Sequence, residues 1–180
     1  MFHSAGYFDQ QLGSWDVSNV TNMQGMFGSK NAFGGGDHVT FNQDISGWDV
    51  GNVTDMTHMF SATTNFEQNL NSWNVSNVRD MSYMFSNSNF DSEIEEWDVS
   101  NVTNMSHMFN RASSFNQSIG DWNVSSVMSM GYMFRDATSF NSPIGNWNTS
   151  SVSNMSLMFE GATSFNQALN DWNISVSYTH

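Results

Sequence analysis

The chain has 180 residues, enough for one globular core or one short array of repeats. Its formal net charge is −13, from 17 acidic residues against 4 lysines and arginines, which argues against binding to nucleic acid or to an anionic membrane surface. No cysteine is present, so disulfides and thiolate metal sites are excluded, and no apolar run reaches the roughly 18 residues of a membrane span.

The sequence repeats from end to end. Among the 180 residues are 7 tryptophans, 15 phenylalanines and 14 methionines. The tryptophans occur at intervals of 33, 25, 24, 25, 25 and 25 residues, and similar residues surround each one. A constant period of this length predicts an array of stacked coils, with the aromatic and methionine columns packed inside.

In chain order, the array opens at Met1 and Phe2 and closes after Trp172, each time in the middle of a repeat. We therefore expect residues 1–180 to be a single segment of about seven tryptophan-centred coils from a longer array. Residues 28–40 add about eight residues to the first interval and contain three consecutive glycines. This insertion predicts a loop at the edge of one coil, where repeat arrays tolerate extra residues.

Within one repeat, the spacing predicts a short strand and then a short helix. Trp48 and Val50 are two residues apart, so on a strand both face inward while Asp49 faces outward. Apolar residues then recur at helical spacing over residues 53–60. The expected fold class is a leucine-rich-repeat-like solenoid: a parallel β-sheet with one short strand per coil of about 25 residues, and short helical segments on the opposite side.

These motifs resemble a known family. They are W-D-V-S-N-V-T-N-M at 15–23 and 97–105, M-F at 26–27 and 108–109, and F-N-Q at 41–43, 115–117 and 165–167. They are similar to the repeats of the BspA-like leucine-rich repeat family, which are 25–26 residues long and occur in bacterial surface proteins and lipoproteins. The resemblance covers nearly the whole chain. It implies a leucine-rich-repeat-like solenoid with a cell-surface, adhesion-type role and without catalytic residues.

Polar residues form regular columns beside the tryptophans. The residue directly after each tryptophan is always an aspartate or asparagine, and we expect this column to face solvent and to contact a partner. Its members are Asp16, Asp49, Asn74, Asp98, Asn123, Asn148 and Asn173. A second column, three residues further on, is typical of asparagine ladders that bond the backbone of the adjacent coil. It contains Asn19, Asn52, Asn77, Asn101, Ser126 and Ser151.

Carboxylates of neighbouring coils share columns, which predicts a cation site. Asp16 and Asp49 form one pair, while Glu96, Asp98 and Asp121 form a second group. Like charges about 4.8 Å apart repel, and Ca²⁺ relieves such repulsion because it prefers oxygen ligands. Solvation of the same side chains, without any ion, is the simpler alternative.

The sequence does not favour catalysis. His58 and His107 fill equivalent slots and are expected on the convex surface, and no serine lies in a G-x-S-x-G motif. We expect a non-enzymatic surface module that presents an acidic, Asn/Ser-rich sheet face to a protein or glycan outside the cell, without nucleic-acid binding or membrane insertion. The alternative is a structural segment of an extracellular filament or stalk, assembled by end-to-end stacking of coils. Ice binding ranks last because the exposed columns lack threonine.

Overall fold

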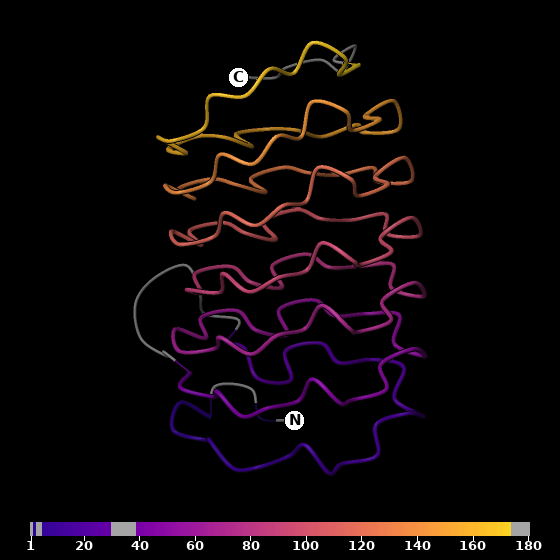
Figure 1. Ribbon diagram of the computed structural model, residues 1–180, viewed down its shortest axis with the longest axis vertical. Coiled ribbons are helices and arrows are strands. Elements are labelled where there is room, and N and C mark those ends of the chain that lie inside the picture. Colours follow the sequence, from indigo (N-terminus) through magenta and orange to yellow (C-terminus); the bar gives the residue numbers. More distant parts are fainter. Residues whose placement is uncertain (1, 3–4, 30–38, 174–180) are drawn as a thin grey trace.

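The computed structural model describes residues 2, 5–29 and 39–173. The chain winds into successive coils stacked along the long axis of the molecule, from indigo to yellow in Figure 1. Backbone hydrogen bonds join each coil to the next. The amide groups of Met81, Met105 and Met130 donate to Asn104, Ser129 and Asn154 at 3.0, 2.9 and 2.8 Å. The predicted insertion lies largely outside the described residues.

The predicted fold class is wrong. The described residues form no helix and no extended strand, and their β-pairing consists of isolated parallel bridges. These bridges are Asn22–Asp55, Val39–Thr63, Asp55–Asp80, Asp80–Asn104, Asn104–Ser129 and Ser129–Asn154. Most of them lie seven residues after a tryptophan, where we expected helix, rather than at the tryptophan itself. Consistent with this, the described residues contain no helix of the length and apolarity that a membrane crossing needs.

The tryptophan segment is not a strand because turns bound it closely on both sides. Trp97 donates its backbone N–H to Ile94, and Val102 donates to Val99, so a single residue, Asp98, lies between the two turns. Neighbouring coils are joined here through side chains. The Trp97 indole N–H donates to the Leu70 carbonyl at 2.8 Å, and the Asn101 amide donates to the Ser76 carbonyl at 2.9 Å.

The expected helix is instead a ribbon of consecutive turns, as residues 105–111 illustrate. The backbone N–H groups of Met105, His107 and Phe109 each donate to the next coil, at 2.9 Å. Of the N–H groups between them, those of Met108 and Asn110 donate to carbonyls three residues back, at 3.1 Å. His107 and Arg111 have φ values of 59° and 60°, which an α-helix does not contain. Apolar spacing alone did not reveal that half of these amides bond another coil.

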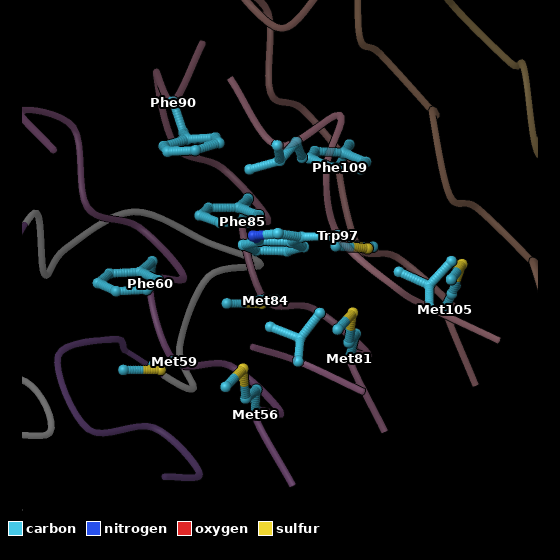
Figure 2. Packing of buried hydrophobic residues seen from close by; sticks show 14 of the residues in the cluster. Met56, Met59, Phe60, Met81, Met84, Phe85, Phe90, Trp97, Met105 and Phe109 are labelled. Carbon is cyan, nitrogen blue, oxygen red and sulfur yellow. The ribbon is translucent and has the colours of Figure 1, made fainter. Parts of the chain in front are cut away.

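The core consists of aromatic ladders that run through the coils. Stacked rings of Phe60, Phe85 and Phe109 have centroids 5.6 and 5.7 Å apart, and Figure 2 shows them beside rows of methionine side chains. Every tryptophan except Trp15 is buried. Burial of one such ring removes about 150–250 Å² from water and contributes about 4–6 kcal/mol before chain entropy is subtracted. The coils and the aromatic ladders of the core therefore repeat with the same period.

Candidate functional site

The predicted binding column after the tryptophans is exposed along the whole stack. Its side chains first serve their own backbone. The Asp16 carboxylate accepts the Ser18 backbone N–H at 3.0 Å and its hydroxyl at 2.6 Å, and Asn74 and Asn123 accept the corresponding groups of Ser76 and Ser125. Each of these three side chains is therefore part of a local turn that leaves its second polar atom toward solvent.

These turns lower the pKa of two aspartates in the column. Hydrogen bonds from the Ser18 hydroxyl and then from its backbone N–H lower the pKa of Asp16, and Ser100 lowers the pKa of Asp98 in the same way. Both carboxylates thus remain ionised close to carboxylates or amides of neighbouring coils. The column presents fixed oxygen atoms at regular intervals.

A second polar surface lies on the other side of each tryptophan. We call it the pre-tryptophan flank and define it as the residues one to five positions before each tryptophan. Three hollows lie along this flank in successive coils. Their volumes are about 260, 620 and 610 Å³. The first is lined by Gln11, Gly13, Ser14, Gln43 and Asp44, and the second by Ser46, Asn69, Asn71, Ser72, Trp73 and Glu96.

The third hollow carries the highest concentration of negative charge. Glu95, Glu96 and Asp121 all line it, together with serine, asparagine and glutamine side chains, and no basic residue does. Glu96 also lines the second hollow, so the two adjoin. An uncompensated negative potential in a concave surface attracts cationic and hydroxyl-bearing groups.

Glycines allow the backbones of neighbouring coils to approach closely along this flank. A Cβ atom added at Gly120 would lie 2.4 Å from the Pro143 carbonyl oxygen, and one at Gly145 would lie 2.6 Å from that of Ala168. Glycine is required where the backbone of one coil passes so close to the next. Glu96 and Asp121 were predicted from the sequence, whereas Glu95, Asp44 and the hollows were not. The recurrent glycine two residues before Trp15, Trp122 and Trp147 was the available signal.

The structure brings only part of the predicted cation groups together. Glu96 and Asp121 line one hollow, but Asp98 is not among the residues around it. Among the described residues, no three histidine, aspartate or glutamate side chains converge on one point as a metal ion requires. Cation binding at Asp16 and Asp49, or at Glu96, Asp98 and Asp121, stays a prediction.

The two equivalent histidines belong to a ring stack. His58, Tyr83, His107 and Tyr132 come from successive coils, with centroids 4.4, 4.3 and 4.5 Å apart. All four are half-buried. Burial, and after it the charges of Arg135 and His58, lower the pKa of His107 to about 4. The predicted exposed convex positions are therefore one more ladder that joins the coils.

Comparison with known proteins gives one match. The model of a family described as "Mycoplasma protein of unknown function, DUF285" matches residues 1–91 and again residues 85–179. No curated protein and no solved structure matches the chain. The double match agrees with the internal repetition and leaves the resemblance to BspA-like repeats a prediction.

Proposed function

This chain belongs to the DUF285 family, and we propose that it is a non-enzymatic interaction module at the cell surface. In this proposal, the pre-tryptophan flank binds a partner outside the cell, either a glycan or a protein segment rich in hydroxyl and amino groups. The resemblance to repeats of bacterial surface proteins supports the location. The stacked coils act as a rigid support that repeats the same polar groups along one side.

One observation carries the proposal: three hollows at equivalent places in the coils, lined by carboxylates, amides and hydroxyls without a basic side chain. The three carboxylates of the third hollow do not converge on one point. They can therefore bind several groups of an extended ligand more readily than a single ion. Amide and hydroxyl side chains supply the directional hydrogen bonds that a sugar or a peptide backbone needs.

A binding experiment with two matched variants tests this function. The probes are a glycan array and an immobilised oligolysine peptide. The variant E95Q/E96Q/D121N removes three charges from the third hollow, and D16N/D49N/D98N removes three charges from the column after the tryptophans. The second set is structurally mild, because asparagine already fills the same slot at positions 74, 123 and 148.

We expect the hollow variant to lose about tenfold in affinity for its best probe, or about 1.4 kcal/mol, while the column variant binds like the parent chain. Binding should also weaken with salt, because exposed charges are screened. If the column variant instead loses affinity while the hollow variant binds like the parent chain, the binding site is the column after the tryptophans. If the parent chain binds neither the glycan array nor the oligolysine peptide, the proposed function is contradicted. Protease shaving of intact cells tests the surface location separately.

A further inference from the structure

The third hollow interrupts a ladder of glutamine side chains. In most coils a glutamine stands two residues after a phenylalanine. The Gln117 amide nitrogen donates to the Asp91 carbonyl at 2.7 Å and to the Asp91 carboxylate at 2.9 Å. Gln167 makes the same two contacts with Asn141, both at 3.0 Å. Each of these glutamines places one nitrogen donor between two oxygen atoms of the preceding coil.

Ser142 fills this slot in the coil between Gln117 and Gln167. It is 5% exposed and lines the third hollow, and no group in the described part of the chain bonds its hydroxyl oxygen. The choice of serine is not the cause, because Ser92 fills the same slot in another coil and donates its hydroxyl to the Glu67 carbonyl at 2.7 Å. A buried hydroxyl without a partner is unfavourable, so this one points to a ligand that supplies the missing contact.

The slot has lost a donor as well as the bulk of a side chain. The Asn116 side-chain oxygen accepts the Asn141 N–H at 2.8 Å, as in other coils. The Asn116 carbonyl corresponds to the Asp91 carbonyl, but no donor from residues 2, 5–29 and 39–173 bonds it. The hollow beside Ser142 has a volume of about 610 Å³. A nitrogen donor can therefore enter from the hollow and replace the glutamine amide.

The charge of the hollow favours a cationic donor. Glu95, Glu96 and Asp121 line it, and none of the described residues around it is a lysine, arginine or histidine. These carboxylates do not converge on one point as the ligands of a metal ion do. An ammonium group does not need such convergence, because its three N–H donors bond separate acceptors.

The width of the slot distinguishes between cationic groups. An unbranched glutamine side chain fills it in the neighbouring coils. A lysine side chain is equally slender and ends in one nitrogen, whereas the arginine guanidinium is a planar fork and the amine of an amino sugar is attached directly to a ring. Pro143 and Ala168 also line the hollow and offer apolar surface to the methylene groups of a lysine.

We propose that the third hollow binds a lysine side chain of a partner protein, with its ammonium group held by the Ser142 hydroxyl, the Asn116 carbonyl and the carboxylates of the hollow. The ammonium nitrogen replaces the missing glutamine amide, and rotation about the Cα–Cβ bond turns the Ser142 hydroxyl toward it. This inference rests on the proposed function and narrows it, because it makes the partner a lysine-bearing protein segment and Ser142 a residue that determines specificity.

Substitutions at Ser142 test the site without removing a carboxylate. Ser142→Gln fills the slot with the residue of the ladder, and Ser142→Ala removes only the hydroxyl. Ser92→Gln is the matched control, because it makes the same change at a slot outside the third hollow. Thermal melts by circular dichroism verify that each variant is folded. The immobilised probes are oligolysine, oligoarginine and Nε-acetylated oligolysine of equal length, together with an oligomer of glucosamine.

We expect the parent chain and Ser92→Gln to bind oligolysine about tenfold more tightly than oligoarginine, because only the slender chain enters the slot. Acetylation of the probe should abolish binding. Ser142→Gln should lower the affinity for oligolysine about tenfold and remove the preference over oligoarginine. Ser142→Ala should lower it about fivefold, the effect of one hydrogen bond to a charged group.

The remaining outcomes separate this inference from the proposed function. If both Ser142 variants bind oligolysine like the parent chain, the lysine site is overturned. A loss of affinity in E95Q/E96Q/D121N would then still support binding at the flank. If the glucosamine oligomer binds more tightly than oligolysine, the partner is a glycan, and the lysine assignment is overturned while the proposed function stands. A parent chain that binds none of the probes contradicts both.

Discussion

Ser142 occupies a slot that glutamine fills in several other coils. The Gln117 side-chain amide donates to the backbone carbonyl of Asp91 at 2.7 Å and to its carboxylate at 2.9 Å, and Gln68 and Gln167 make the same two contacts. Ser142 is 5% exposed, and its hydroxyl oxygen has no hydrogen-bond partner. One rung of a side-chain ladder is therefore missing at this coil.

We expect Ser142→Gln to stabilise the fold by about 1 kcal/mol, because the new amide reaches the Asn116 carbonyl and an unsatisfied hydroxyl is removed. The third hollow beside Ser142 leaves room for the longer side chain. Urea unfolding measures the change.

Gln117→Ser is the mirror control and should destabilise the fold by a similar amount. If Ser142→Gln instead lowers the free energy of unfolding, the slot is too tight for the ladder to be completed.

His107 makes the stability of the fold depend on pH. In the folded state its pKa is lowered from 6.5 to about 4, so the folded chain binds fewer protons than the unfolded chain between these values. Its stabilising contribution is therefore complete above pH 6.5 and is lost as the pH falls toward 4. The groups that face the ring are Tyr83, Tyr132, Arg135 and Asn110, besides the charge of His58.

We expect His107→Tyr to flatten the pH dependence of the melting temperature between pH 6.5 and 4 while keeping the ring stack. Tyrosine already occupies this slot at Tyr83 and Tyr132, with φ values of 59° and 60°. The measurement is the melting temperature of both chains at each pH, and their difference removes the common titration of the carboxylates. Parallel curves for the two chains would exclude His107 as the source.

At the scale of one coil, stability depends on how each indole binds the coil before it. The Trp97 ring is buried and donates to the Leu70 carbonyl at 2.8 Å. Trp97→Phe removes one of the two donors to that carbonyl, which keeps the Trp73 backbone N–H at 3.0 Å, and should destabilise the fold by about 1 kcal/mol beyond the loss of ring area.

The control is Trp15→Phe, which changes the same atoms at an indole without a partner among the described residues. It should cost much less. Denaturant midpoints compare the two variants directly. Equal losses would mean that ring volume rather than the hydrogen bond joins the coils.

The strand and the helix that we expected within each coil were both wrong. The apolar spacing over residues 53–60 fits both a helix and a ribbon of turns whose alternate amides bond another coil. Only the presence of neighbouring coils distinguishes them, since they supply the carbonyls that half of the amides need. The Trp48–Val50 segment faces inward and outward as a strand would, yet it is too short between its two turns to extend a sheet.

At the scale of the whole molecule, the net charge of −13 makes Ca²⁺ the ion to test. If Ca²⁺ binds the carboxylates of neighbouring coils, it should raise the melting temperature more than NaCl at equal ionic strength. The gain is about 2.7 kcal/mol at a Ca²⁺ concentration about 100 times the dissociation constant. Calorimetry in CaCl₂, MgCl₂ and chelator measures it, and E95Q/E96Q/D121N and D16N/D49N/D98N identify the carboxylates. A melt that chelator leaves unchanged counts against both cation groups.

The candidate site could be predicted only in part. The exposure of Asp16, Asn74 and the rest of their column follows from alternation beside a buried tryptophan, and the sequence contains that alternation. The hollows do not follow from it, because they depend on how far the backbones of two coils approach each other at Gly120 and Gly145. A one-dimensional pattern contains no such distance.

The sequence by itself determined which side chains are buried, how often they recur and which polar columns accompany them. The reason is that aromatic rings must leave water, and a fixed period allows them to do so only on one another. The tertiary structure alone decided the backbone conformation and the hollows. Each of these depends on which hydrogen-bond groups of one coil meet those of the next, and that pairing exists only once the coils are stacked.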